Sequence, residues 1–328
     1  TENIGERVSL RGLVEFSNNC SCDCYYCGIR KSNFKVRRYT LTKEEIIDTS
    51  IYCANAGYGS IVLQSGEMQS KKFIDYVEEI LIEIKNSTRS DLLPEGLGIT
   101  LCVGEQSAET YRRFFKAGAH RYLLRIETSN EGLFGKLHPP GQSYRRRLEC
   151  LDLLKDIGYQ VGTGVMIGLP GQTLANLAED ILFFMERDID MIGMGPFIAH
   201  HDTPFAGFAL DNSERKNNIY QLALKMIAVT RIVLKDVNIA STTALQAMNP
   251  IGREEGLNFG ANVVMPQITP SAYRKDYLLY EGKPCVVENN DECLSCIKRR
   301  IESTGRKIKC NEWGDSLHFN NRLKNKVL

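Results

Sequence analysis

The sequence predicts an α/β protein of the TIM-type (β/α)8 barrel class. Strand-like and helix-like segments alternate about eight times between residues 7 and 269. The strand-like runs are short, continuously apolar and bounded by glycine and proline, which is typical of parallel strands buried on both faces. No glycine-rich dinucleotide-binding turn follows the first strand, so a doubly wound open sheet is the less favoured alternative.

The predicted strands and helices follow one another in order along the chain. The strands cover residues 7–17, 60–67, 96–105, 121–129, 160–171, 191–198, 237–245 and 262–269. The helices cover residues 41–57, 71–86, 107–118, 145–157, 173–188, about 212–235 and 252–261. Thr42 and Glu45 form a capping-box pattern at the first helix, and Gly57, Gly118 and Gly158 lie where glycine commonly ends a helix.

Composition limits the classes of partner. Apolar residues make up 43% and charged residues 25% of the 328 residues, and the formal net charge is +1. This balance gives no reason to expect a nucleic-acid partner. No apolar run reaches the ~18–20 residues that span a bilayer, so we expect no membrane association. Eleven cysteines, an odd number without a secretory context, predict free thiols in a reducing compartment, the cytoplasm.

We expect two parts, a barrel over residues 1–270 and a cysteine-bearing C-terminal extension over residues 271–328, in a monomeric protein. Active sites of such barrels lie at the C-terminal ends of the strands. The residues that follow each predicted strand are therefore the candidates for chemistry.

The loop after the first strand, "NNCSCDCYYCGIR", holds four cysteines. Cys20, Cys24 and Cys27 are spaced C-x3-C-x2-C, with Cys22 inside the first gap. A cubane iron–sulfur cluster held by three thiolates leaves one iron open, which suits a catalytic rim. A structural zinc ion needs a fourth ligand, which only Cys22 could supply within this loop, and this is the less favoured alternative.

This loop in a βα barrel resembles the radical S-adenosylmethionine (SAM) superfamily, and Tyr26 before the third cysteine fits the same pattern. The resemblance implies a 4Fe–4S cluster whose open iron binds SAM, and an oxygen-sensitive enzyme. It also implies a low-potential electron donor, whose electron cleaves SAM to methionine and a 5′-deoxyadenosyl radical.

The resemblance also assigns SAM contacts at the ends of later strands. Gly66 and Glu67 of "SGE" are similar to the motif that holds the methionine ammonium, and Glu127 to the residue that binds the ribose. Arg147 is similar to the arginine that pairs with the methionine carboxylate. The adenine contacts that it implies are Met166, Phe197 and Ile198. Taken without the resemblance, these residues read as a turn, surface charges and barrel core.

Longer stretches resemble one family within this superfamily, the FeFe-hydrogenase maturases HydE. They include "RYLLRIET", "GLPGQT", "GPFIAHHDTP" and "GANVVMPQITPSAYRKDYLLYEGKPC". The resemblance implies a small organometallic substrate, an iron bearing carbonyl, cyanide and a cysteine, destined for the di-iron subcluster. It also implies other hydrogenase maturases as partners.

Two departures from that family leave alternatives open. Ile126 replaces a histidine that is common in the family, and Ile268 replaces a tryptophan of its relatives. Both positions are expected on or near the cavity. The chain could therefore be a HydE-like paralogue, or an enzyme like methylornithine synthase or biotin synthase that acts on a small amino-acid-derived substrate. A third hypothesis is a metal-stabilised binding protein without catalysis, which would bind RNA through basic clusters at 35–38 and 145–147.

The predicted substrate site combines Arg125 with Thr242 and Thr243 at the ends of strands four and seven. A guanidinium flanked by two hydroxyls is a good carboxylate receptor. Tyr273 and Tyr277 are expected to help close it. The alternative is that Arg125 pairs with Glu127 or Glu105 and that the threonines are strand residues.

The remaining cysteines fall into two sets. Cys285, Cys293 and Cys296 are spaced C-x7-C-x2-C, and the resemblance implies an auxiliary iron–sulfur cluster there, dispensable for SAM cleavage. Leftover buried thiols are the alternative for this set. The cysteines predicted to be core are Cys53, Cys102 and Cys150. His200 and His201 are predicted to be hydrogen-bonding rim residues rather than metal ligands.

Overall fold

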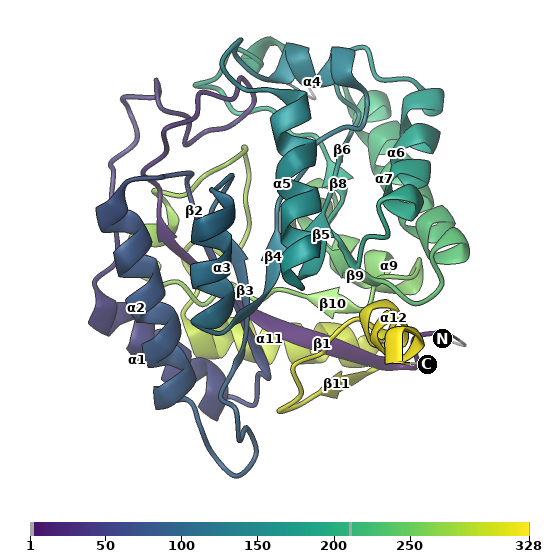
Figure 1. Ribbon diagram of the computed structural model, residues 1–328. Coiled ribbons are helices and arrows are strands. Elements are labelled where there is room, and N and C mark those ends of the chain that lie inside the picture. The colour runs from purple at the N-terminus through teal and green to yellow at the C-terminus, as the bar shows by residue number, and fades with distance from the viewer. Residues whose placement is uncertain (1–2, 210–211, 328) are drawn as a thin grey trace.

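The computed structural model describes residues 3–209 and 212–327 and contains a closed barrel of eight parallel strands (Figure 1). In barrel order the strands are β1 (Arg7–Ser17), β2 (Ser60–Ser65), β3 (Gly98–Cys102), β4 (Ala119–Leu123), β5 (Gln160–Thr163), β7 (Met191–Ile192), β9 (Asn238–Ser241) and β10 (Val263–Val264). The parallel pairing of Ser9 and Leu10 with Val263 and Val264 closes the ring. The predicted barrel is confirmed.

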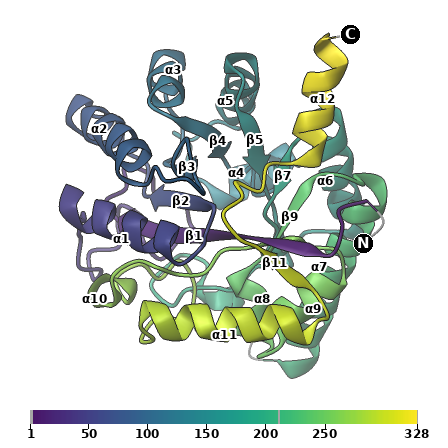
Figure 2. The same cartoon turned by 90° about the horizontal axis from the view of Figure 1, so that it is seen from below.

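Helices surround the barrel, as the view along its axis shows (Figure 2). They are α1 (Lys43–Asn55), α2 (Lys71–Ser87), α3 (Ala108–Lys116), α4 (Glu131–Leu137), α5 (Tyr144–Ile157), α6 (Leu174–Glu186), α7 (Ser213–Val233), α8 (Thr243–Met248), α9 (Gly252–Asn258), α10 (Ser271–Arg274), α11 (Asn290–Ser303) and α12 (Leu317–Val327). The predicted capping box of Thr42 and Glu45 starts α1. Gly158, at a φ of 106°, ends α5 in the left-handed conformation that glycine tolerates.

Two predicted strands are each divided in the structure. The segment 160–171 forms β5 and then β6 (Met166–Ile167), and the segment 191–198 forms β7 and then β8 (Gly195–Pro196). At the break, a Cβ on Gly164 would lie 1.7 Å from the carbonyl oxygen of Gly193. The two backbones can approach this closely only because Gly164 lacks a side chain. Beyond the break, β6 and β8 pair as a separate two-stranded sheet at the top of the barrel.

The C-terminal segment crosses the lower end of the barrel (Figure 2). Strand β11 (Lys307–Lys309) pairs in parallel with the start of β1. Beyond it, the carbonyl oxygen of Trp313 accepts hydrogen bonds from Ser60 (2.6 Å) and from Arg121 (2.9 Å), both at the lower ends of barrel strands. The segment therefore closes the end of the barrel opposite the site.

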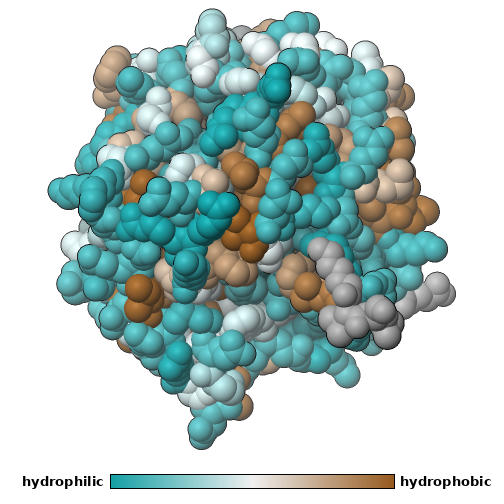
Figure 3. Space-filling model, viewed as in Figure 1, coloured by the Kyte–Doolittle hydropathy of each residue, from teal (hydrophilic) through white to brown (hydrophobic). Residues whose placement is uncertain are grey.

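The outer surface is mostly polar, and the hydrophobic side chains on the face of Figure 3 show near the middle, between α3 and α5, and at the right edge, near α6 and α7. Within the described residues, the helices include none with the length and apolar character needed to cross a membrane.

Candidate active site

A cavity of about 250 Å³ lies inside the barrel at the C-terminal ends of its strands. Its wall brings together nine residues predicted from the sequence: Tyr26, Cys27, Arg125, Glu127, Met166, Phe197, Ile198, Thr242 and Thr243. Residues from strands far apart in the sequence thus face one enclosed space. The arrangement is that of a barrel active site.

The cysteine loop is fixed to the end of β2 by hydrogen bonds. The carbonyl oxygen of Glu67 accepts from the backbone N–H of Ser21 (2.8 Å), and the N–H of Glu67 donates to the sulfur of Cys20 (3.3 Å). A contact with the Cys22 thiol, more than the opposing effect of burial, lowers the pKa of Cys20 to about 7. The loop thus stabilises one thiolate before any metal is bound.

The three cysteines fit a cluster better than a zinc ion. Four ligands around one zinc ion lie about 3.8 Å from one another. Within the described residues, the ligand atoms of His200, His201 and Asp202 form the one group of three that lies within 4.8 Å, so no three sulfurs of the cysteine loop lie that close together. Wider spacing is expected where each thiolate binds a different iron. Burial raises the pKa of Cys24 to about 12, so this thiolate depends on a bound cation.

Gly66 fits closely beneath this loop. A Cβ at this position would lie 2.3 Å from the carbonyl oxygen of Asn19 and 2.7 Å from the Cβ of Cys20. Both atoms belong to the loop that presents the first cysteine, so a side chain would push that cysteine away from the other two.

We therefore expect Gly66→Ala to lower the iron content after anaerobic reconstitution by about tenfold or more. Loss of a residue that supports a metal ligand lowers metal affinity by about that much. Iron and sulfide are measured chemically, and circular dichroism checks the fold. Gly135→Ala is the matched control, because a Cβ there meets nothing within 4 Å. Equal iron in the two variants would contradict this role for Gly66.

Glu127 is held in an unusual backbone conformation at the cavity. Its φ is 65°, and it is buried. Its carboxylate accepts hydrogen bonds from Arg125 (3.1 Å to each oxygen) and from the hydroxyl of Tyr26 (3.3 Å). A non-glycine residue in the left-handed region commonly marks a functional site. These contacts position the carboxylate beside the cysteine loop.

Arg147 is buried near the cavity rather than on a solvated helix face. Its Nε donates to Glu105 (2.6 Å), and its guanidinium also donates to the carbonyl oxygen of Arg125. Arg147 therefore already forms an ion pair within the protein, with the carboxylate of Glu105 after β3. Glu67 has a comparable internal partner, because its carboxylate accepts from the N–H of Glu105 (2.8 Å).

The predicted carboxylate receptor is only partly free. Arg125 lines the cavity, but it pairs with Glu127, and it also donates to the carbonyl oxygens of Gly193 (2.7 Å) and Val165 (3.0 Å). The pairing with Glu127 is the alternative that the sequence left open. Two of the five N–H groups of the guanidinium remain for a ligand.

The two threonines differ in the direction of their hydrogen bonds. The hydroxyl of Thr242 donates to the carbonyl oxygen of Met194 (3.3 Å), whereas that of Thr243 accepts from Arg253 (3.3 Å). Thr243 therefore keeps its hydroxyl hydrogen for a ligand in the cavity.

The two tyrosines expected to close the site do not line it. Tyr273 donates to Glu45 (2.8 Å) on α1, outside the barrel, so its predicted role is not supported by its position. Tyr277 is fully buried and accepts from Gln64 (3.3 Å) behind the cavity wall. Tyr280 of the same segment lines the cavity instead, because the chain turns its side chain inward three residues later.

Sequence reasoning also missed a buried ion pair in the cavity wall. Glu15 on β1 and Lys283 lie 2.5 Å apart, and both line the cavity. They are 268 positions apart in the sequence, so no local pattern could have paired them. Cys102, predicted to be core, also lines the cavity, whereas Cys53 and Cys150 are buried as predicted.

The C-terminal cysteines lie outside the cavity. The thiol of Cys285 interacts with that of Cys293 on α11, and this contact, more than burial, lowers the pKa of Cys285 to about 6. Cys296, one turn further along α11, accepts a hydrogen bond from Arg300 (3.3 Å). The structure thus brings two of the three thiols into contact.

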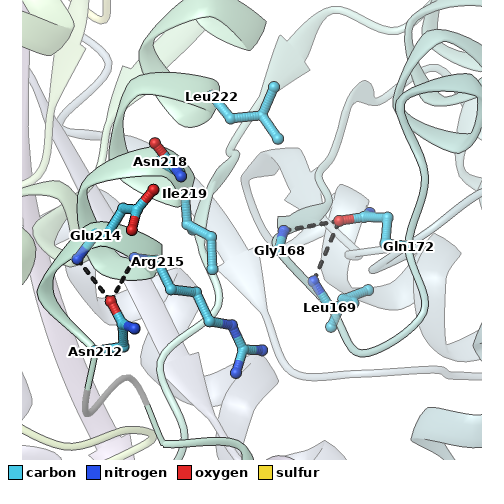
Figure 4. A pocket seen from close by; sticks show the side chains of 9 residues that line it. All are labelled: Gly168, Leu169, Gln172, Asn212, Glu214, Arg215, Asn218, Ile219 and Leu222. Carbon is cyan, nitrogen blue, oxygen red and sulfur yellow. Dashed lines mark hydrogen bonds between the residues drawn. The ribbon is translucent and has the colours of Figure 1, made fainter.

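Two other features lie near the rim. His201 pairs with Glu281 and Asp202, but the ligand atoms of His200, His201 and Asp202 also lie within 4.8 Å of one another, so the role expected for the two histidines stays a prediction. A hollow of about 400 Å³ lies outside the barrel, between the start of α7 and the turn after β6 (Figure 4). In it, Oε1 of Gln172 accepts from the N–H groups of Gly168 (2.7 Å) and Leu169 (3.2 Å), so this side chain is used to fix the turn. None of the predicted site residues lines this hollow.

Comparisons with known proteins agree with this site. The model of the family described as "Radical SAM superfamily" matches residues 14–184. The [FeFe] hydrogenase maturase subunit HydE of Thermotoga maritima is 45% identical over 311 residues, which cover 95% of this chain and 84% of that protein. The 3-methylornithine synthase of Methanosarcina acetivorans is 26% identical over 92% of this chain and 80% of that protein.

A crystal structure of methylornithine synthase has a TM-score of 0.77 and 26% identity, and the match covers 94% of this chain and 86% of that one. Radical SAM enzymes use a 4Fe–4S cluster and SAM, and the three-cysteine loop beside the cavity suits both. The protein therefore belongs to the radical SAM superfamily of enzymes and, within it, to the HydE family.

Proposed function

We propose that this enzyme matures FeFe-hydrogenase, by radical chemistry on an iron complex that carries a cysteine, carbonyl and cyanide. The observation that carries the proposal is the cavity itself. The cysteine loop contributes Tyr26 and Cys27 to its wall, which also contains Arg125, Thr243 and the Glu15–Lys283 ion pair. The similarity to the HydE of Thermotoga maritima supports the same assignment.

In this proposal Cys20, Cys24 and Cys27 hold the cluster, and Glu127 orients the ribose of SAM. When the cluster and SAM are bound, they supply the one-electron cleavage of the sulfonium bond of SAM. Met166, Phe197 and Ile198 give the adenine an apolar surface and exclude water, which protects a reactive species. For the other SAM contacts we propose Tyr26, Gly66, Glu67 and Arg147.

In this proposal Arg125 and Thr243 receive the cysteine of the substrate. The hydroxyl of Thr243 donates a hydrogen bond to the substrate carboxylate, and the two remaining N–H groups of Arg125 add charge-assisted hydrogen bonds. Thr242 contributes less, because its hydrogen is directed at Met194. The substrate sulfur then lies toward the cysteine loop.

The two departures from the family do not argue for another substrate. Ile126 and Ile268 are both fully buried in the hydrophobic core, and neither side chain lines the cavity. Neither isoleucine therefore contributes to the cavity wall of this chain.

The test adds the reconstituted enzyme to a defined maturation mixture that contains the other maturases but no HydE. We expect hydrogenase activity to be restored. A parallel assay supplies lysine and seeks 3-methylornithine by mass spectrometry, since synthases of that compound share the fold and 26% identity. Formation of 3-methylornithine without hydrogenase activity would replace the proposal.

We expect Thr243→Val to weaken the binding of cysteine or a cysteine-derived thiazolidine by about tenfold or more. A hydrogen bond to a charged group contributes about 1.5–3 kcal/mol. Thr242→Val is the matched comparison and should lose less. Binding is measured by titration, with SAM cleavage followed separately. Equal binding by both variants and the parent would mean that the carboxylate is held elsewhere.

Further proposals concern the setting of the enzyme. Eleven free thiols support a reducing compartment such as the cytoplasm. The eight barrel strands leave no edge for pairing with a second chain, and only the short β11 and the β6–β8 pair offer one, which supports a monomer. The contact between Cys285 and Cys293 supports an auxiliary cluster with Cys296 in the extension 271–328, dispensable for SAM cleavage because it lies outside the cavity. The proposed partners are a low-potential electron donor and other hydrogenase maturases.

A further inference from the structure

We propose that residues 30–38, the donor loop, dock an acidic low-potential electron-donor protein beside the cysteine loop. The inference rests on the proposed function, because SAM cleavage consumes one electron that the enzyme itself does not generate. It adds the surface at which that electron enters and the chemistry of the partner that delivers it.

The donor loop lies against the outside of the cysteine loop. The N–H of Lys31 donates to the carbonyl oxygen of Cys22 (2.8 Å), and Arg30 forms an ion pair with Asp23 (2.5 Å). Figure 1 shows this part of the chain as the purple loops at the upper left, beyond the end of β1. A protein bound here would be one layer of backbone away from the cysteine loop, and electron transfer favours such short paths.

The donor loop exposes one large aromatic side chain. Phe34 is 91% exposed, more than any other large hydrophobic residue among those described. Burying a phenylalanine side chain contributes about 1.5–3 kcal/mol. Its immediate neighbour Lys35 and the nearby Lys31 and Arg37 are also exposed. An aromatic residue inside a charged rim is the usual composition of a small protein interface.

The structure holds Phe34 outward by fixing the backbone around it. The guanidinium of Arg38 donates to the carbonyl oxygens of Asn18 (2.6 Å), Ile29 (2.8 Å) and Asn33 (3.1 Å). The buried side chain of Asn33 donates to the carbonyl oxygen of Gly28 (2.7 Å). A preorganised loop loses little conformational entropy on binding. These bonds account for Arg38 in the basic cluster at 35–38.

The charge of the donor loop selects an acidic partner. Three of its cations have acidic partners within the protein: Arg30 with Asp23, Lys35 with Asp202, and Arg37 with Asp276. Lys31 and Arg38 have no carboxylate within 4.0 Å in the described parts of the chain. Five cations against these three acids and Glu281, which His201 links to Asp202, leave an excess of +1 here. Such a patch steers an acidic protein into place and binds it weakly.

A small iron–sulfur or flavin protein fits this surface better than a nucleic acid. A nucleic-acid interface carries a much larger excess of positive charge than this surface, on which three carboxylates are interleaved with the cations. Transient redox complexes bury less than about 1,200 Å², for which one aromatic residue and a basic rim suffice. In the step, the reduced donor loses one electron, the cleavage of one SAM consumes it, and no atom passes between the two proteins.

The test compares two ways of reducing the reconstituted enzyme. Deoxyadenosine formation is driven either by a reduced acidic ferredoxin or by dithionite, a small reductant that needs no docking surface. The variants are Phe34→Ala and the pair Lys31→Glu with Lys35→Glu. The matched controls are Leu92→Ala, a residue 68% exposed at the opposite end of the barrel, and Arg89→Glu beside it. Calorimetry measures ferredoxin binding directly, at low and at high salt.

We expect the charge-reversed variant to bind ferredoxin about tenfold or more weakly and to lose the salt dependence of binding. Its ferredoxin-driven cleavage should fall in proportion, while dithionite-driven cleavage and both controls stay unchanged. Unchanged binding in both variants would overturn the inference, and so would equal losses with both reductants. If the parent enzyme cleaves no SAM with dithionite, the proposed function fails, and the calorimetry then decides whether the docking surface exists.

Discussion

Replacing Cys20, Cys24 or Cys27 with alanine is expected to abolish 5′-deoxyadenosine formation, whereas Cys22→Ala should retain it. Three thiolates must each hold one iron, so that a single iron stays open for SAM. The loss of any one leaves the cluster with too few protein ligands. The four positions lie in one loop and are all partly buried, so a general effect of mutating a cysteine would affect them alike.

The measurement is deoxyadenosine formation under dithionite, with iron content and the visible absorption of the cluster recorded for each variant. Cys22→Ala is the internal control, although its thiol contacts Cys20 and contributes to the lowered pKa of that residue. Parental turnover in Cys24→Ala would overturn the assignment. If the cluster is lost in Cys22→Ala and kept in Cys24→Ala, then Cys22 rather than Cys24 is the ligand.

The barrel could be predicted from short sequence patterns because its strands and helices are marked by residues that are close together in the sequence. The spacing of Thr42 and Glu45, and glycine at position 158, mark helix ends through contacts within one turn. The break between β5 and β6 was not predicted, because it depends on Gly164 meeting Gly193 across two strands. A pattern read along one segment holds no information about the strand that lies beside it.

The same limit explains which site residues were found. Cys27 and Glu127 follow or belong to strands, so the barrel rule directs them to the cavity, whereas Met166 was assigned through the resemblance to the radical SAM superfamily. The Glu15–Lys283 pair and the inward turn of Tyr280 depend on how the segment after β10 crosses the barrel mouth. Tyr273 was expected there for the same reason, but it is bonded to α1 instead.

Asp315→Ala is expected to cause the largest loss of stability among the substitutions discussed here. Arg121 is fully buried at the closed end of the barrel, and its guanidinium donates to Asp315 (2.6 Å). Arg11 is also fully buried and close enough to interact with both charges. Asp315 is thus the carboxylate that balances two buried cations.

Removing one partner of a buried ion pair costs about 3–5 kcal/mol, because the other charge remains buried without compensation. The free energy of unfolding, measured in urea, should fall by about this amount in Asp315→Ala. Asp152→Ala is the matched control, because the Asp152–Arg187 pair is largely exposed and such pairs contribute about 0–1 kcal/mol. Equal losses in the two variants would show that the buried cations do not depend on Asp315.

The loss of stability at acidic pH provides a second test of the contact between Asp315 and Arg121. Burial alone would raise the pKa of Asp315, but the hydrogen bond from His120 and the charge of Arg121 hold it well below its usual range. A depressed carboxyl pKa adds stability at pH values above the unfolded pKa of about 3.9, and that stability is lost as the pH falls further. We therefore expect the free energy of unfolding of the parent to drop below about pH 4 more steeply than that of Asp315→Asn, which has no carboxyl to titrate. Parallel acid limbs in the two proteins would mean that Asp315 titrates normally and that the end of the barrel is held closed by the backbone hydrogen bonds of Trp313 and Gly314 instead.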